Sequence, residues 1–244
     1  FIAAYVQVIH NSASPTVDIY IDGALAVEGF EYRAATPVIT LPTSFTVGIA
    51  PAGGDVIASF PFELAAGGSY VVVATGLLGD DITPFDLAAT GTTFGASSTD
   101  VVGLEVYHGS TDAPGVDILA DANEGAVLVS SLSYGEFSGY VEVPAADYTI
   151  GIAPAGGEAI AAFTAPLSGL GGDNLFICSE RVSPVQVIVS PFNKPASSRF
   201  LTMTCTPPFV SISTIEYFPK GLASTITGTT FFDKWLNSSE LIMS

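Results

Sequence analysis

The chain contains the same segment twice, and this internal repeat restricts its fold more than any other feature. The heptapeptide GIAPAGG occupies residues 48–54 and again 151–157. The stretches VIHNSASPTVDIYIDG and VYHGSTDAPGVDILAD, which begin at Val8 and Val106, precede the two heptapeptides. A repeating unit of about 100 residues is a domain and is too long for a solenoid repeat. We therefore predict two tandem copies of one domain.

Apolar and polar residues alternate within each copy. In TVDIYID, Val17, Ile19 and Ile21 predict one buried face. Val116, Ile118 and Ala120 repeat this face in the second copy. A period of two is typical of half-buried strands, and the Pro and Gly-Gly of the heptapeptide favour a tight turn with positive φ between two strands. About six or seven short strands per copy predict an all-β fold of two tandem immunoglobulin-like β-sandwiches.

The predicted domain boundaries follow the repeat. The segment between the copies is rich in Gly, Thr, Ser and Asp and is interpreted as a linker or a long edge excursion. The C-terminal region is predicted to be β-rich. It would either complete the second sandwich or serve sorting or assembly. The alternative is that the sequence of this region comes from an altered reading frame. The boundaries are 1–78 for the first sandwich, 79–102 for the linker, 103–180 for the second sandwich and 181–244 for the tail.

Charge is distributed unevenly along the chain, whose formal net charge is −18. Residues 1–174 hold 20 of the 24 acidic residues and one of the six basic residues, so the remaining segment holds 4 acidic and 5 basic residues. A surface so poor in Lys and Arg cannot neutralise phosphates, which argues against nucleic acid and anionic membranes as partners. No apolar run reaches the roughly 18–20 residues that span a bilayer, so membrane insertion is not expected.

The sequence favours a secreted location, extracellular or at the cell surface. It starts at Phe1 on a predicted strand, which a removed signal peptide or a fragment of a longer chain would explain. Cys178 and Cys205 are the only two cysteines. In an oxidising location they could form one disulfide that closes a loop of about 27 residues.

At the repeated motif the chain resembles the DUF4397 family, whose domains occur in secreted and surface proteins of bacteria, and the tandem copies resemble the Bacteroidetes-type versions most. The resemblance covers about residues 4–177. It implies a sandwich-type extracellular domain and supplies no catalytic residues. The motif is an apolar strand ending in His, followed by Ser, Pro and Val-Asp: His10, Ser12, Pro15, Val17 and Asp18, then His108, Ser110, Pro114, Val116 and Asp117.

Each histidine and aspartate of the motif could in principle supply a general base or metal ligands. Each repeated motif, however, has one His and no Cys for a closed metal site, and no Gly-x-Ser-x-Gly elbow provides a nucleophile. We therefore predict no catalytic residue, no cofactor and no metal site. The interpretation is a structural motif in which the histidine bonds to the following loop: His10, Pro15 and Asp18, and His108, Pro114 and Asp117.

Two other functions of the acidic residues, glycoside hydrolysis and calcium binding, have less support in the sequence. Asp18 and Asp22 stand about 13 Å apart along an extended strand, and the same spacing recurs in the second copy. This separation exceeds the roughly 5–9.5 Å that glycoside hydrolysis requires. Aspartates of the linker could bind calcium, but solvated loop acidity is the favoured interpretation of Asp80, Asp81, Asp86 and Asp100.

The sequence predicts a secreted, non-enzymatic structural or adhesive protein that associates with itself or with cell-surface or matrix components. A more specific hypothesis is that Ile2–Ile9 adds a strand to a neighbour's sheet and so builds filaments. The simpler interpretation is that this segment is the first strand of its own sandwich. The alternative is a carbohydrate-binding module, and an enzyme is a third class. In that module, glycans would stack on Tyr20, Phe30, Tyr32 and Tyr140.

Overall fold

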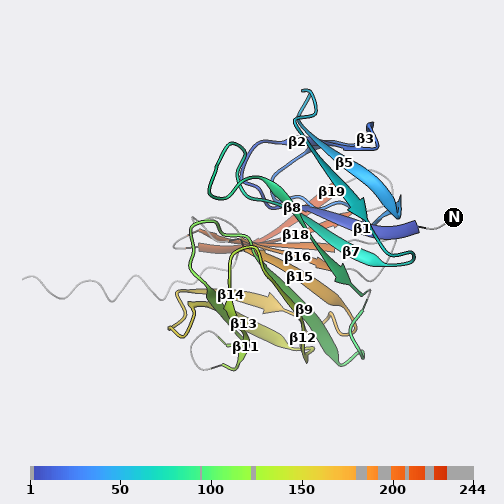
Figure 1. Cartoon of the computed structure of the whole chain (residues 1–244). Coiled ribbons are helices and arrows are strands. Elements are labelled where there is room, and N and C mark those ends of the chain that lie inside the picture. The colour runs from blue at the N-terminus through green and yellow to red at the C-terminus, as the bar shows by residue number, and fades with distance from the viewer. Residues whose placement is uncertain are drawn as a thin grey trace, which may run out of the picture.

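The structure is a computed structural model that describes residues 3–93, 95–121 and 125–178 in full, and the backbone of residue 179 and of strands 186–191, 199–206, 209–217 and 223–229. Every element within these residues is a β-strand, and the strands form four sheets (Figure 1). The predicted all-β fold of two tandem sandwiches is confirmed. The described part of the chain contains no helix long and apolar enough to cross a membrane.

The first sandwich consists of two four-stranded sheets, with strand orders β4-β1-β7-β8 and β3-β2-β5-β6. Strand β1 pairs antiparallel with β4 and parallel with β7, so the N-terminal strand lies inside its own sheet. The strands are β1 (Ala3–His10), β2 (Val17–Ile21), β3 (Ala24–Phe30), β4 (Ile39–Pro42), β5 (Ser44–Pro51), β6 (Ala58–Glu63), β7 (Ser69–Thr75) and β8 (Asp86–Thr92).

The second sandwich repeats this topology. Strands β11-β10-β13-β14 form one sheet, and β12-β9-β15 begin the other, with β9 parallel to β15 as β1 is to β7. The strands are β9 (Val101–His108), β10 (Val116–Leu119), β11 (Val127–Leu132), β12 (Phe137–Pro144), β13 (Asp147–Pro154), β14 (Ala161–Pro166) and β15 (Asn174–Ser179).

The segment between the copies belongs largely to the first sandwich. Strand β8 lies within residues 79–102 and pairs antiparallel with β7 along its whole length, from Ser69↔Thr92 to Thr75↔Asp86. The first sheet therefore gains an edge strand from a segment whose composition resembles that of a linker.

Beyond the second copy, the chain extends the sheet of β9 and β15 with four antiparallel strands. The full order is β12-β9-β15-β16-β17-β18-β19, so β16 adjoins β15 as β8 adjoins β7. The β-rich tail predicted from the sequence is thus joined to the second sandwich. Its strands are β16 (Gln186–Pro191), β17 (Arg199–Thr206), β18 (Phe209–Tyr217) and β19 (Ala223–Thr229).

The strand order does not favour the suggested disulfide. Cys178 lies on β15 and Cys205 on β17, and β16 separates these strands. Strands two apart in a sheet are about 10 Å apart, whereas a disulfide joins Cα atoms about 4.4–6.8 Å apart. The thiol of Cys178 is buried and free, and the side chain of Cys205 lies outside the described residues.

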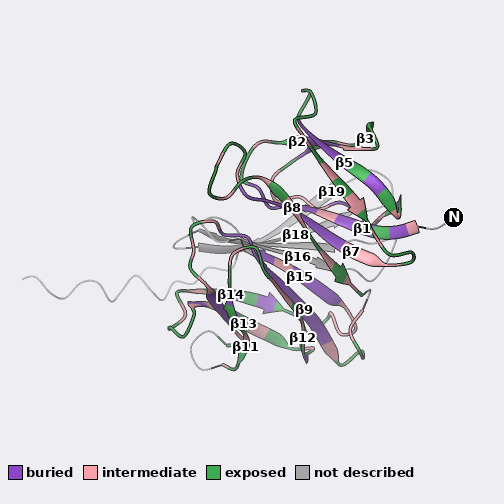
Figure 2. Cartoon of the chain, viewed as in Figure 1, coloured by how far each residue is buried: buried purple, intermediate pink, exposed green. Residues whose placement is uncertain are grey.

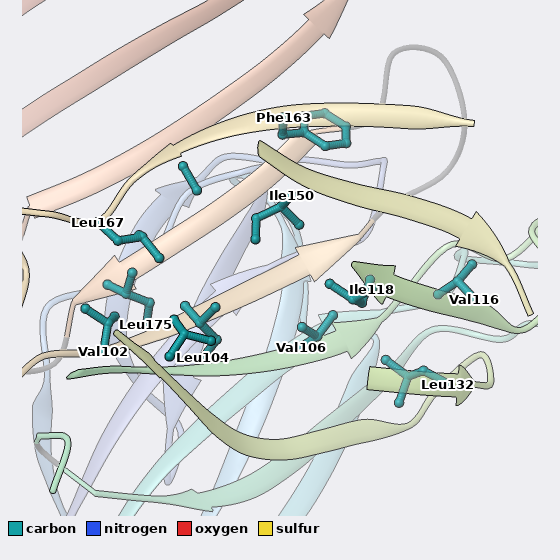
Figure 3. Packing of buried hydrophobic residues seen from close by; sticks show 12 residues of the cluster. Val102, Leu104, Val106, Val116, Ile118, Leu132, Ile150, Phe163, Leu167 and Leu175 are labelled. Carbon is teal, nitrogen blue, oxygen red and sulfur yellow. The ribbon is translucent and has the colours of Figure 1, made fainter. Parts of the chain in front are cut away.

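Each sandwich buries its own apolar core between its two sheets. The first core includes Val17 and Ile19, with Ile21 partly buried against it, and these are the three residues that the two-residue period assigns to the inner face. Figure 2 shows the buried positions concentrated on the strands that face one another, and Figure 3 shows the equivalent core of the second sandwich. That core includes Val102, Leu104, Val106, Val116, Ile118, Leu132, Ile150, Phe163, Leu167 and Leu175.

The heptapeptide forms a tight turn in both copies, as predicted. Gly53 and Gly156 have φ values of 72° and 73°, which residues with a Cβ adopt only at an energetic cost. In the first copy the Gly54 N–H donates to the Pro51 carbonyl at 2.7 Å, and the second copy repeats this bond at the same distance. The turn joins β5 to β6 and β13 to β14.

Candidate functional site

The aspartates of the repeated motif hold the heptapeptide turns. Asp18 is buried on β2, and its Oδ2 accepts a hydrogen bond of 2.8 Å from the N–H of Gly53. Asp117 on β10 accepts an equivalent bond of 2.8 Å from Gly156. The two repeated sequences, Val-Asp and GIAPAGG, are therefore the two halves of one contact in each copy.

The second carboxylate oxygen of each aspartate binds an irregular part of the neighbouring strand. Asp18 Oδ1 accepts the N–H of Gly29 at 2.7 Å, and Asp117 Oδ1 accepts the N–H of Ser131 at 2.6 Å. Gly29 and Ser131 have φ values of 60° and 52°, and both lie where the strand register shifts. The aspartate thus stabilises a β-bulge, which leaves ladder groups unpaired unless something else bonds to them.

These hydrogen bonds also set the charge of the two aspartates. The N–H groups of Gly29 and Gly53 lower the pKa of Asp18, because they stabilise the carboxylate more than the neutral acid. The N–H groups of Gly156 and Ser131 lower the pKa of Asp117 in the same way. Both side chains therefore act as anionic hydrogen-bond acceptors and not as proton donors at neutral pH.

The histidines close the loop that follows the first strand of each copy. His10 Nε2 lies 3.1 Å from the Pro15 carbonyl, and His108 Nε2 lies 2.9 Å from the Pro114 carbonyl. Since a carbonyl only accepts, Nε2 carries the proton and donates it in both rings. This contact is the His-to-loop hydrogen bond that the sequence predicts.

A tyrosine ring forms a T-shaped pair with each histidine, and sequence reasoning did not identify this pairing. The ring centroids of His10 and Tyr32 are 6.3 Å apart at 77°, and those of His108 and Tyr134 are 6.4 Å apart at 84°. The available signal was the presence of tyrosine at matching positions of the two copies. Each motif thus combines a buried histidine, a loop carbonyl and a half-buried tyrosine.

The environment of His10 makes the stability of the fold sensitive to mild acid. Burial lowers the pKa of His10, the Pro15 carbonyl opposes this shift, and Nδ1 is buried without a hydrogen-bond partner among the described residues. Because the unfolded chain binds a proton more readily than the folded one, folding stability should fall as pH drops below about 6.5.

Thermal melts between pH 8 and pH 5 would show this decrease, and proton NMR would show a His10 ring that takes up its proton at a lower pH than an ordinary histidine. A His10→Gln chain identifies the His10 signals by their loss. A His10 ring that titrates at or above the ordinary value would contradict this prediction.

The structure does not combine these side chains into a reaction centre. His10 and Asp18 have separate backbone partners, as do His108 and Asp117. Within the described ranges, no three His, Cys, Asp or Glu side chains lie together in a way that could hold a metal ion. Among the linker aspartates, Asp80 accepts two N–H groups of its own turn.

The four aromatic residues considered for sugar stacking lie in different environments. Phe30 is buried in the first core, 5.5 Å from the His10 ring, and Tyr32 is covered by the guanidinium of Arg33 at 4.8 Å. Tyr140 bonds to Thr92 at the contact between the sandwiches, and Tyr20 is half-buried on an outer sheet. The four do not form one platform.

A third buried cluster joins the two sandwiches and is called the junction here. It lies outside both cores, where the outward face of β1 and β7 meets the outward face of β9 and β15 (Figure 1). Figure 2 shows these strands buried along most of their length. The buried members of the junction are Ile9, Val71, Val73, Tyr107, Phe176 and Cys178.

The same positions of each copy form the junction. Ile9 and Tyr107 stand one residue before the motif histidines, and they pair with Val73 and Cys178 on the neighbouring parallel strands. The two sandwiches therefore meet like subunits of a dimer with an isologous interface, in which one surface patch contacts its own counterpart.

At two matched positions of the junction, the first copy has a small side chain and the second copy has a phenylalanine. Val71 of the first copy corresponds to Phe176 of the second, and Ala35 corresponds to Phe137 on the adjoining strand. Two first copies would leave a void at this contact, and two second copies would overfill it. The packing therefore favours the pairing of one first copy with one second copy.

Polar contacts surround the junction at the end of β8. The hydroxyls of Thr92 and Tyr140 lie 2.6 Å apart. Asn174 Nδ2 lies within 3.1 Å of the Thr93 and Gly95 carbonyls and 2.8 Å from Thr93 Oγ1. The segment that connects the copies is thereby attached to the second sandwich.

The comparisons with known proteins agree with the repeat. The family model described as "Domain of unknown function (DUF4397)" matches the chain twice, at residues 4–101 and 102–171. The first match includes β8, in agreement with its place in the first sandwich. Comparison with curated proteins finds no significant match. The two family matches cover more than half of the chain, which therefore belongs to the DUF4397 family as a tandem pair of its domains.

Proposed function

We propose that this chain is a secreted structural or adhesive protein of the cell surface or extracellular matrix, without enzymatic activity. The observation that carries the proposal is the use of the repeated polar residues. The histidines and aspartates that recur in both copies bind backbone groups of their own domain. Such contacts shape and hold the loops and leave these side chains no evident role in binding a substrate.

The junction supports the same proposal. It buries apolar side chains from both copies and is bordered by hydrogen bonds. A buried contact of this kind holds two domains in one orientation, whereas domains joined only by a flexible linker move independently. A fixed pair of sandwiches suits a building block that has to transmit force or present a surface.

Self-association by strand addition remains part of the proposal, but through an edge and not through the N-terminal strand. Strand β1 is paired on both sides, so deletion of residues 1–9 would remove a central strand and unfold the first sandwich. Strands β6 and β14 are sheet edges in the described part of the chain. Pro61 lies within β6 and cannot donate to an added strand, whereas the proline of β14 is its last residue, Pro166, and the exposed Thr164 stands at the register of Pro61. We propose β14 as the acceptor edge.

A Thr164→Pro variant tests assembly at this edge. Light scattering and negative-stain electron microscopy should show oligomers or filaments of the natural chain, and Thr164→Pro should reduce their amount at least tenfold by removing one backbone donor. Folding should persist, because the first sandwich accommodates Pro61 at this register. Thr164→Ser, which keeps the N–H, is the matched control and should assemble normally.

The competing functions predict other results. A natural chain that stays monomeric at all concentrations would reject assembly at β14. Saturable binding on a glycan array, lost in a Tyr20→Ala variant, would favour the carbohydrate-binding alternative. An activity lost in a folded chain that lacks both His10 and His108 would favour an enzyme.

A further inference from the structure

Glu105 places a carboxyl where the first copy has a neutral amide. Glu105 of β9 stands opposite Phe176, as Gln7 of β1 stands opposite Val71, so the two residues occupy equivalent positions on the faces that form the junction. They are 2% and 1% exposed. The Gln7 amide donates to the Thr36 carbonyl at 2.8 Å within its own sandwich.

The carboxyl of Glu105 faces the other sandwich with incomplete hydrogen bonding. Thr90 of β8 donates to Oε1 at 3.3 Å, a long bond from the first sandwich, and Oε2 is buried with no hydrogen-bond partner within the described ranges. The groups that interact with it from neighbouring strands are Tyr140 of β12 and Cys178 of β15. Tyr107 follows on its own strand, and Asp86 of β8 interacts with Tyr107. None of these residues is a cation that could balance a buried carboxylate.

The burial of Glu105 changes the pKa of its carboxyl group. Desolvation raises the pKa of Glu105 to about 7, and the hydroxyls of Thr90 and Tyr140 oppose the rise. A carboxyl in solvent has an ordinary value of 4.5. The closed junction therefore retains a proton at Glu105 in a pH range where an exposed glutamate has lost it.

We infer that the junction is a pH-responsive contact, closed most firmly when Glu105 is protonated and loosened when the carboxylate is charged. Opening exposes the carboxyl to water and releases its proton, so opening becomes easier as pH rises from about 4.5 to about 7 and then levels off. This dependence is opposite in sign to that of His10, whose burial weakens the fold as pH falls.

Cys178 provides a local probe of junction opening. Its side chain is fully buried in the junction, and burial raises the pKa of its thiol, so a thiol reagent should modify it only after the two faces separate. A Cys205→Ser change leaves Cys178 as the only thiol of the chain. Division of each labelling rate by the rate of the urea-unfolded chain at the same pH removes the intrinsic pH dependence of the reagent.

The test compares the normalised labelling rate at pH 5 and pH 8 in the natural and Glu105→Gln chains, both carrying Cys205→Ser. The natural chain should label roughly tenfold or more faster at pH 8. Glu105→Gln installs the amide of the first copy and should label at nearly the same slow rate at both pH values. Thr90→Val removes the hydroxyl that favours the charged carboxylate, and should move the midpoint of the change to higher pH.

Two results would overturn the inference. One is a normalised labelling rate that does not change between pH 5 and pH 8 in the natural chain. The other is an equal increase in the Glu105→Gln chain, which would assign the pH dependence to another group. Should Glu105→Gln fail to fold, an unchanged midpoint in Thr90→Val would serve as the contradicting result.

Discussion

Replacing Phe176 with alanine is expected to lower the free energy of unfolding by about 3–5 kcal/mol, the cost of a large cavity at a fully buried aromatic position. Phe176 is 0% exposed, and its ring lies 5.9 Å from that of Phe137 within the junction. The small side chains of the first copy, such as Val71, cannot fill the space. Urea unfolding followed by circular dichroism measures the loss, and Cys178 labelling should accelerate at every pH.

Two further substitutions serve as comparisons for the stability loss of Phe176→Ala. Val71→Ala removes fewer carbon atoms at the equivalent position of the first copy and should cost less than Phe176→Ala. Ile160→Ala acts at a side chain that is 75% exposed and should change stability by no more than about 0.5 kcal/mol. A cost below about 1 kcal/mol for Phe176→Ala would show that the two faces do not pack as described.

Replacing Asp18 with alanine is expected to lower the melting temperature by roughly 5 °C or more. The change leaves the N–H groups of Gly53 and Gly29 without their charged acceptor, at the turn and at the bulge together. Differential scanning calorimetry at pH 7 measures the shift. The carboxylate with its lowered pKa favours folding most above the ordinary value of about 4, so acid should diminish the difference between the two chains.

Asp55→Ala is the matched control, because Asp55 is an exposed aspartate of the same hairpin and its loss changes the net charge equally. It should leave the melting temperature nearly unchanged. Asp117→Ala should reproduce the effect of Asp18→Ala, because Asp117 binds Gly156 and Ser131 in the same geometry. A small effect in the first copy and a large one in the second would contradict a shared structural role.

Local patterns were sufficient to predict the two sandwiches and their principal turn. The alternation of Val17, Ile19 and Ile21 predicts a buried face because successive side chains of a strand point to opposite sides. The Gly-Gly of the heptapeptide predicts the turn because positive φ is a local requirement, and Gly53 and Gly156 meet it. Composition alone, in contrast, could not decide between a linker and an edge excursion for the segment that forms β8, since a short edge strand rich in Ala, Thr and Gly resembles a linker.

The partners of the repeated motif could be predicted only in part. His10 and its loop carbonyl are five residues apart, so the sequence could suggest their contact. Asp18 and Gly53 are 35 residues apart, and their contact depends on the pairing of β2 with β5. The repetition of both segments in both copies was the signal that they belong together.

The sequence by itself determined the tandem pair of all-β domains and the turn between β5 and β6, because these follow from residue type and short-range spacing. The tertiary structure alone decided that one face of each sandwich is buried against the other. The continuous apolar run Val71–Ala74 indicates burial on both faces of a strand, but it cannot specify what covers the second face. The positions of Phe176 and Glu105 in the junction depend on contacts between distant strands. Such contacts cannot be predicted from the spacing of residues along the chain.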